Sequence, residues 1–160
     1  MFTMMNRARL AVGLSGVAIA ERATQQALTY ARDRKQGKST IIGYPDVKRM
    51  LLTMRALTHA ARTICYATAV ALDRSQRSKT EAARKAGDER ASLLTPIAKA
   101  FSTDAGIEVA SLGVRVHGGM GFIEVTGAVQ YDRDARIPPI YEGTNGIQAL
   151  DLVTRKVPLN

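Results

Sequence analysis

The chain has 160 residues, enough for one domain with a hydrophobic core and too few for two domains of ordinary size. Hydrophobic residues make up 46% and charged residues 23%, values typical of a globular protein, which exclude a disordered chain. The net charge is +9, but the basic residues are scattered, and aromatic residues make up 5% without any tryptophan. This composition argues against a nucleic-acid platform and suits a phosphate-bearing ligand, or basic faces that a partner covers. No internal repeat or Gly/Ser linker divides the sequence, so we expect residues 1–160 to form a single domain.

Cysteine and histidine residues indicate neither a disulfide nor a metal site. Cys65 is the one cysteine and lies among apolar residues at helical spacing, which predicts a core position. His59 and His117 are far apart, and no other ligand types stand near them at metal-binding spacing. We therefore expect no internal disulfide and no metal.

The apolar run at residues 10–20 resembles a secretory signal, because arginines precede it and an Ala-Ile-Ala triplet ends it. Small and polar residues weaken the run, and its helical pattern continues to Ala31, so we interpret it as part of a helix. No stretch reaches the roughly 20 apolar residues of a transmembrane helix. We expect a protein of the cytoplasm, or of the mitochondrial matrix if it is eukaryotic.

Helical periodicity dominates the first half of the chain. A first helix is predicted over about residues 3–33 and ends before the loop-like residues 37–40. A second helix should open at Pro45, because proline is tolerated in a first turn. The charged residues 74–85 carry no apolar stripe and are interpreted as a helix end and an exposed connection.

The second half continues the helical pattern. A third helix should start at Asp88 as N-cap, with a kink or break caused by Pro96, and should end at the glycines of 118–121. Shorter helices are predicted over about 127–135 and 145–156, the last one capped by Thr144. Since no segment alternates as a half-buried strand would, the predicted fold is all-α, an antiparallel four-helix bundle.

Two features of the C-terminal half suggest chemistry. Gly118, Gly119 and Gly121 follow a helix, where missing Cβ atoms would let a ligand approach the backbone; a plain helix cap and turn is the alternative. Glu142 follows a Pro-Pro pair and precedes Gly143. Burial among apolar residues would raise the pKa of such a carboxyl group and suit it as a general base, whereas the alternative is a solvated glutamate near a helix start.

Several segments resemble one family in the expected order. Residues 140–148 (IYEGTNGIQ) resemble the C-terminal signature of the acyl-CoA dehydrogenases. Residues 116–122 (VHGGMGF) and 131–137 (YDRDARI) resemble the two stretches that precede it. Residues 6–10 and 30–36 resemble the beginning and end of the domain's first long helix. Residues 44–52, together with the absence of Phe after Gln36, resemble the larger members, which act on fatty or sulfur-containing acyl-CoAs and carry an extra C-terminal domain.

The resemblance implies the C-terminal four-helix bundle of an enzyme whose N-terminal helical and middle β domains are not in this chain. It implies FAD as cofactor, an acyl-CoA as substrate, electron-transfer flavoprotein as acceptor, and a homo-oligomer. In the family, a carboxylate removes the α-proton of the thioester, and the β-hydride passes to the flavin. Glu142 matches this base, and its main-chain N–H matches one donor to the thioester carbonyl. Some relatives place the base at the position of Ala8, which cannot serve.

Further roles carry over from the same resemblance. Arg34 matches an arginine that contacts the FAD diphosphate across the subunit interface, Gly119 a glycine beside the adenosine part, and Thr144 a threonine that contacts FAD. Gly118 is assigned to the cofactor with Gly119. Arg115 and Gly146 stand where many members have glutamines that contact FAD, so these contacts differ in detail.

Substrate roles are implied for four residues. Asn6 and Arg9 match positions near the CoA moiety or the thioester, and Tyr141 and Gly143 flank the expected base. We expect the chain by itself to fold, to lack activity, and to hold FAD weakly or not at all. The alternatives are a domain of an acyl-CoA oxidase and a non-catalytic helical module that binds a partner.

Overall fold

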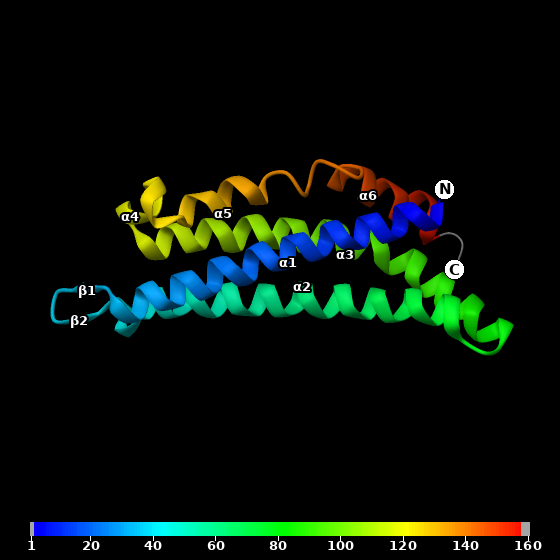
Figure 1. The fold of residues 1–160 in the computed structure, drawn as a ribbon, viewed down its shortest axis with the longest axis horizontal. Helices are drawn as coiled ribbons and strands as arrows, with labels where there is room; N and C mark the ends of the chain where they lie inside the picture. Colours follow the sequence, from blue (N-terminus) through cyan, green and yellow to red (C-terminus); the bar gives the residue numbers. More distant parts are fainter. Residues whose placement is uncertain (1, 158–160) are drawn as a thin grey trace.

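Three long helices lie side by side and alternate in direction. The computed structural model describes residues 2–157, with side chains from residue 5 onward. The helices are α1 (Phe2–Asp33), α2 (Pro45–Arg77) and α3 (Glu81–His117), and α3 contacts both of the others. Shorter helices form a fourth row along α3 and α1 (Figure 1). The predicted all-α bundle is confirmed.

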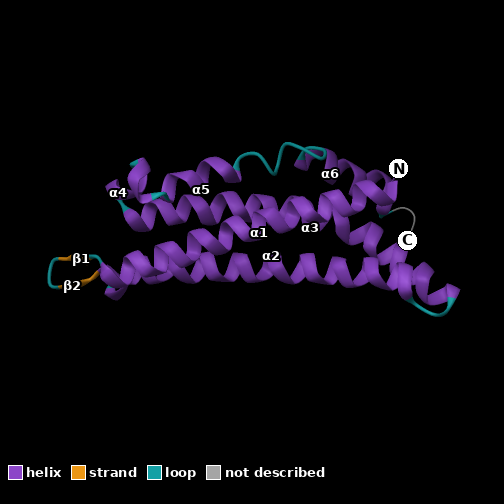
Figure 2. Cartoon of the chain, in the orientation of Figure 1, coloured by secondary structure: helices purple, strands orange, loops and turns teal. Residues whose placement is uncertain are grey.

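The fourth row holds the C-terminal segments. It consists of α4 (Gly119–Phe122), the 3-10 turn η2 (Glu124–Thr126), α5 (Ala128–Ala135) and α6 (Asn145–Asp151). A π-helical turn, η3 (Leu152–Lys156), continues α6. The expected short helices at 127–135 and 145–156 are confirmed, and the Thr144 hydroxyl caps α6 by accepting from the Ile147 N–H. Figure 2 shows the long loop that joins α5 to α6.

The start of α3 differs from the prediction. Thr80 is the N-cap, because its hydroxyl accepts from the Ala83 N–H, so α3 begins seven residues before Asp88. Residues 81–85, expected in an exposed connection, form its first turns. Gly87 lies inside the helix where α2 passes so closely that a Cβ would stand 2.6 Å from the Ser75 nitrogen. The glycine therefore serves helix packing, which its sequence neighbours do not reveal.

Pro96 bends α3 without breaking it. The helix is continuous from Glu81 to His117, and Figure 1 shows its first part running obliquely to the rest. A proline inside a helix removes one backbone hydrogen bond and crowds the preceding turn, which accounts for the bend.

A small hairpin joins α1 to α2 where the sequence predicted only a loop. Strands β1 (Lys35–Gln36) and β2 (Ser39–Thr40) pair antiparallel, and Gly37 adopts a φ of 64° at the turn. Two residues per strand are too few for an alternating pattern, so the hairpin was not predicted. The 3-10 turn η1 (Ile41–Gly43) leads into α2.

The core is built from small side chains, which let the helices approach closely. Buried alanines line α1 at Ala20, Ala23, Ala27 and Ala31. Cys65 is buried as predicted, and burial raises the pKa of its thiol. No helix within residues 2–157 is both long and apolar enough to cross a membrane.

Candidate active site

Glu142 stands on the loop between α5 and α6 in a conformation that side chains rarely adopt. Its φ is 55°, and it is the only non-glycine residue with positive φ among residues 2–157. Gly143 follows with a φ of 84°. A non-glycine residue in the left-handed region costs on the order of 1–3 kcal/mol and persists only where its surroundings hold it. The Glu142 backbone is therefore fixed by contacts with the rest of the fold.

Two buried side chains provide these contacts. Lys99 of α3 is 0% exposed, and its ammonium donates to the Gly143 carbonyl at 2.8 Å and to the Asn145 side-chain oxygen at 2.9 Å. Gln148 of α6 is 1% exposed, and its amide donates to the carbonyls of Glu142 at 3.3 Å and Gly143 at 3.1 Å. Both carbonyls are thus held from inside the bundle.

Asn145 connects this loop to α3. Its amide nitrogen donates to the Asp104 carboxylate at 2.7 Å and to the Thr103 hydroxyl at 3.0 Å. Its own backbone N–H donates to the Pro139 carbonyl at 3.0 Å, which closes the loop on itself. The loop is therefore a fixed part of the fold.

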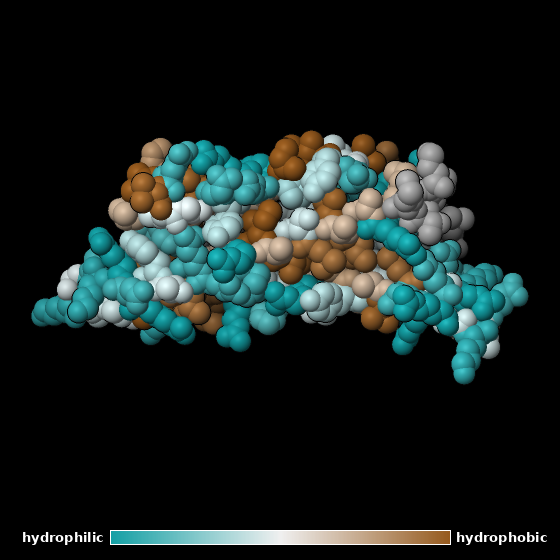
Figure 3. Space-filling view, in the orientation of Figure 1, coloured by the Kyte–Doolittle hydropathy of each residue, from teal (hydrophilic) through white to brown (hydrophobic). Residues whose placement is uncertain are grey.

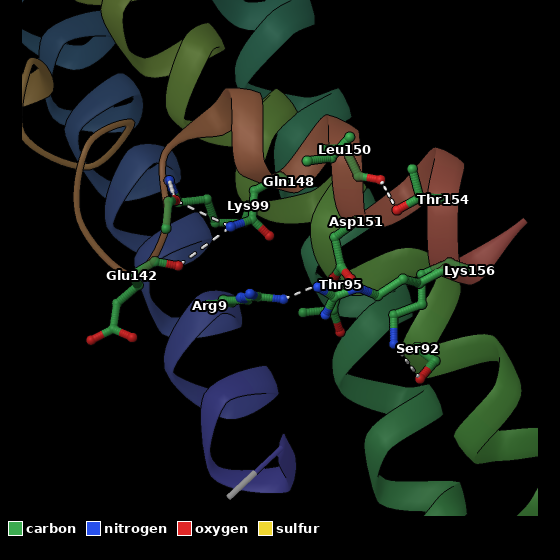
Figure 4. Close-up of polar contacts among 12 residues, drawn as sticks. Arg9, Ser92, Thr95, Lys99, Glu142, Gln148, Leu150, Asp151, Thr154 and Lys156 are labelled. Carbon is green, nitrogen blue, oxygen red and sulfur yellow. Dashed lines mark hydrogen bonds and ion pairs between the residues drawn. The ribbon is translucent and has the colours of Figure 1, made fainter.

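The carboxylate of Glu142 points outward. Figure 4 shows it directed away from Lys99, and the residue is exposed. The expected burial of the Glu142 carboxylate among apolar side chains of this chain is therefore wrong, because the residue is exposed. No acceptor in the described part of the chain takes the Glu142 N–H. One residue thus offers both a base and an unused backbone donor.

Lys99 has a perturbed environment. Burial lowers the pKa of Lys99, Asp104 opposes that shift by its negative charge, Arg9 adds to it, and Glu142 opposes it. This lysine was not among the site residues predicted from the sequence. A signal was present, because Thr95, Ser102 and Thr103 lie one helical turn away on the same buried face.

Arg9 and Asn6 lie next to this loop at the start of α1. The Arg9 guanidinium pairs with Asp151 at 3.1 Å, both side chains being about nine-tenths buried, while its Nε is buried without a partner among residues 5–157. Arg9 and Asn6 line a cavity of about 320 Å³ at this end of the bundle. Arg9 is therefore tied to α6 by a largely buried ion pair.

A second hollow, of about 860 Å³, lies at the other end of α1. Arg34 and Arg115 are exposed there, and neither guanidinium has a hydrogen-bond or ion-pair partner in the described part of the chain. Gly118 adopts a φ of 62°, and a Cβ at Gly118 or Gly119 would enter open space. Two cations and an open backbone form a cradle suited to a phosphate-bearing group. The lining residues are Tyr30, Arg34, Gln36, Ile41, Tyr44, Val47, Arg115, Val116, His117, Gly118, Gly119 and Met120.

The third glycine of this cluster has another purpose. A Cβ at Gly121 would collide with the Val114 carbonyl, so packing alone accounts for a glycine at this position. His117 forms the inner wall of the hollow instead. Its Nδ1 donates to the Gly113 carbonyl at 2.7 Å, and its ring stacks on Tyr30 with centroids 4.3 Å apart. The sequence analysis assigned His117 no such role.

The predicted site residues therefore fall into two groups. Arg34, Arg115, Gly118 and Gly119 meet at the end that carries α4. Asn6, Arg9, Tyr141, Glu142, Gly143, Thr144 and Gly146 belong to the end that carries α6, where α1 begins (Figure 1). No residue of the second group lines the hollow at the α4 end, so the two groups do not share that hollow within one chain. Within residues 2–157, no cluster of three or more His, Cys, Asp or Glu side chains is placed to hold a metal ion.

The chain matches one family along nearly all of its length. A model of the family described as "Acyl-CoA dehydrogenase, C-terminal domain" matches residues 1–157. The 3-methylmercaptopropionyl-CoA dehydrogenase of Ruegeria pomeroyi is 55% identical over 98% of the chain, which spans only 28% of that relative. An acyl-CoA dehydrogenase from Bacillus anthracis, solved in complex with FAD, superposes with a TM-score of 0.85 at 29% identity, over 99% of this chain and 29% of that one. A chain solved in work on the electron transferring flavoprotein of Acidaminococcus fermentans gives a TM-score of 0.79 at 27% identity, over 94% and 37%.

Proposed function

The chain belongs to the acyl-CoA dehydrogenase family, and we propose that it supplies the general base and part of the flavin-binding surface of an FAD-dependent acyl-CoA dehydrogenase. The observation that carries this proposal is the loop geometry at Glu142. A fixed, left-handed residue presents an outward carboxylate and an unused N–H from one position. The chain spans only 28% of the Ruegeria relative, so the complete enzyme would also contain the part of that relative that this chain does not match.

The chain's own residues account for proton removal. The α-proton of an acyl thioester is a weak acid until its carbonyl is polarised, and the Glu142 N–H is available to donate to that oxygen. The Glu142 carboxylate then accepts the α-proton. Bound FAD would supply the acceptor for the hydride that leaves the β-carbon, and the product is a trans-2-enoyl-CoA. Closure of the site by the rest of the enzyme would remove water from around Glu142 and make it a stronger base.

The hollow at the α4 end fits the phosphate-bearing part of FAD. Arg34 and Arg115 provide unpaired guanidinium groups, and Gly118 and Gly119 leave room that a Cβ would fill. This hollow lies at the α4 end of the bundle, whereas the loop that carries Glu142 joins α5 to α6 farther along it (Figure 1), and Glu142 does not line the hollow. This separation supports a homo-oligomer in which the hollow serves the flavin of a neighbouring subunit. Thr144 and Gly146 would contact the flavin beside Glu142.

Several apolar side chains are exposed on the fourth row of helices. Figure 3 shows them gathered near α4 and around the loop and helix that follow α5. We propose that the remainder of the enzyme and a second subunit cover them, and that the chain alone is inactive and retains little FAD. They are Met120, Phe122, Ile123, Val125, Ile137, Ile140, Tyr141, Ile147, Leu150, Val153 and Val157.

Substrate and acceptor are proposed only as classes. The name of the Ruegeria relative supports an acyl-CoA, of the fatty or sulfur-containing kind, as substrate. Asn6 and Arg9, which line the cavity at the start of α1, and Tyr141 and Gly143, which flank Glu142, are the residues proposed to contact it. The Acidaminococcus neighbour supports electron-transfer flavoprotein as acceptor.

The test uses the complete flavin-loaded protein that carries this chain. Wild type, Glu142→Gln and the surface control Glu81→Gln are compared for bound flavin and for ferrocenium-coupled turnover of a panel of acyl-CoAs. We expect Glu142→Gln to keep its flavin and lose turnover by about 10³-fold or more, as for loss of a catalytic base, while Glu81→Gln stays active. A wild type without flavin would favour the non-catalytic binding module, and a fully active Glu142→Gln would show that another group is the base. Oxygen consumption by the reduced wild type would instead indicate an oxidase.

A further inference from the structure

The buried ammonium of Lys99 holds the catalytic loop from the inside, and we infer that Lys99 is a positioning residue for Glu142. This inference rests on the proposed function. Lys99 lies on α3, 44 residues before Gly143 in sequence, yet its ammonium reaches the Gly143 carbonyl at 2.8 Å. It is the largest side chain in the described part of the protein that is fully buried.

The contact fixes the backbone directly behind the carboxylate. Glu142 and Gly143 are consecutive left-handed residues, so a small rotation at either would swing the Glu142 side chain. Lys99 and Gln148 both donate to the Gly143 carbonyl, and Gln148 also reaches the carbonyl of Glu142. The carbonyls are thereby held toward the bundle, while the carboxylate points away from Lys99 (Figure 4). The N–H and carboxylate of Glu142 stay available together only while this arrangement persists.

The ammonium also joins the loop to a rigid element. It donates to the Asn145 side-chain oxygen at 2.9 Å, and the nitrogen of the same amide donates to Asp104 on α3. The loop is thus connected to α3 through two separate donors. Without Lys99, the Gly143 carbonyl would accept a side-chain hydrogen bond from Gln148 alone. The side-chain oxygen of Asn145 would also lose the hydrogen bond that it accepts from Lys99.

Stability alone gives no reason for a lysine here. Both of its hydrogen-bond acceptors are uncharged, and burial lowers its pKa, so the site bears the cost of a desolvated cation. A methionine of similar length would fill the same volume without that cost. What methionine cannot do is donate two hydrogen bonds to the loop that carries Glu142.

The test compares Lys99→Met with wild type in the complete flavin-loaded protein. Turnover is expressed per bound flavin, and the isotope effect on kcat is measured with an acyl-CoA deuterated at the α-carbon. We expect kcat to fall about 10- to 100-fold, KM to change less than about threefold, and the α-deuterium isotope effect to rise, because a misaligned base slows proton abstraction. Thr80→Ala, which removes the N-cap hydrogen bond of α3 and lies outside both groups of site residues, serves as a destabilised control and should leave the isotope effect unchanged.

The outcomes separate this inference from the proposed function. If Lys99→Met shows normal kcat per flavin and an unchanged isotope effect while Glu142→Gln is inactive, the positioning role is overturned and the base assignment stands. If Glu142→Gln is active, the proposed function fails first. If Lys99→Met does not fold, Lys99→Gln and Gln148→Met are measured in the same way. An unchanged isotope effect in both Lys99→Gln and Gln148→Met overturns the inference, and a raised isotope effect in either variant supports it.

Discussion

Gly16 of α1 lies directly against the backbone of Ser102 on α3, so closely that a Cβ on the glycine would collide with the Ser102 carbonyl oxygen. Gly106 meets Gly16 from α3, where its own Cβ would stand 3.1 Å from the Gly16 carbonyl oxygen. The two helices therefore cross at their backbones, without intervening side chains. This crossing holds α1, with Arg9 at one end and Arg34 at the other, against the helix that carries Lys99.

Substitution at the crossing should destabilise the fold. Gly16→Ala must push α1 and α3 apart, because the colliding atom is backbone, and we expect a loss of about 1–3 kcal/mol in the free energy of unfolding. Urea denaturation of the two proteins measures the difference. Gly119→Ala is the matched control, since its Cβ enters open space. Equal stability of Gly16→Ala and wild type would show that the helices can separate without cost.

The thiol of Cys65 should be unreactive in the folded protein. It is fully buried beside the Ser102 hydroxyl at 3.2 Å, and burial raises its pKa, so the thiolate forms only when the chain opens. We expect an aromatic disulfide reagent to label it slowly in buffer and at once in concentrated denaturant. Because its folded pKa exceeds the ordinary value, its contribution to stability is present below about pH 9.0 and is lost as the pH rises further. Rapid labelling of the native protein would contradict the burial.

The ion pair between Glu21 and Arg62 should stabilise the fold weakly at neutral pH, and this contribution should be lost in acid. Arg62 donates to the Glu21 carboxylate at 2.8 Å, and this hydrogen bond, with a second from Gln25, lowers the pKa of Glu21. The contribution is present above the ordinary pKa of 4.5 and is lost as the pH falls through the lower folded value. Both side chains are about a third exposed, so Glu21→Gln should cost at most about 1 kcal/mol at neutral pH. Denaturant titrations at pH 7 and pH 3 should show this difference shrinking at the lower pH, and a constant difference would contradict the pair's role.

Arg34 should matter for cofactor affinity and not for folding. It is exposed, and its guanidinium has no partner within the described residues, so Arg34→Gln should leave the unfolding temperature unchanged. A lost charge-assisted contact to phosphate is worth about 1.5–3 kcal/mol, so the Kd for FAD of the complete protein should rise about 10- to 100-fold. Arg55→Gln, an exposed arginine on α2, is the control. Equal FAD affinity in both variants would remove Arg34 from the flavin surface.

Local signals predicted most of the helices. Pro45 opens α2, Thr144 caps α6, and the glycine at 118 ends α3, all as periodicity and capping rules indicate. Thr80 was overlooked, because the charged residues around it hide the start of α3. The reason for glycine at positions 87 and 121 could not be predicted locally, because a Cβ there would collide with backbone that only the fold brings close.

The candidate site was predicted only in part, because contacts between segments that are distant in sequence determine the rest. The motifs named the candidate site residues, but the grouping of these residues into two parts of the bundle depends on the fold and not on sequence order. Lys99 resembles a solvated helix lysine in the sequence. Only its position on the buried face of α3, opposite a loop 44 residues away, reveals what it contacts. The pairing of Arg9 with Asp151 joins the two ends of the chain and could not be read from either segment alone.

The most direct test of the account is exchange of the substrate α-proton. The complete flavin-loaded protein is incubated in D₂O with an acyl-CoA analogue that cannot lose a β-hydride, and deuterium at the α-carbon is followed by mass spectrometry. If Glu142 is the base, wild type and Glu81→Gln should exchange the proton, and Glu142→Gln should not exceed the rate without enzyme. Exchange at the wild-type rate in flavin-loaded Glu142→Gln would show that another group removes the proton, and would contradict the role assigned to the loop.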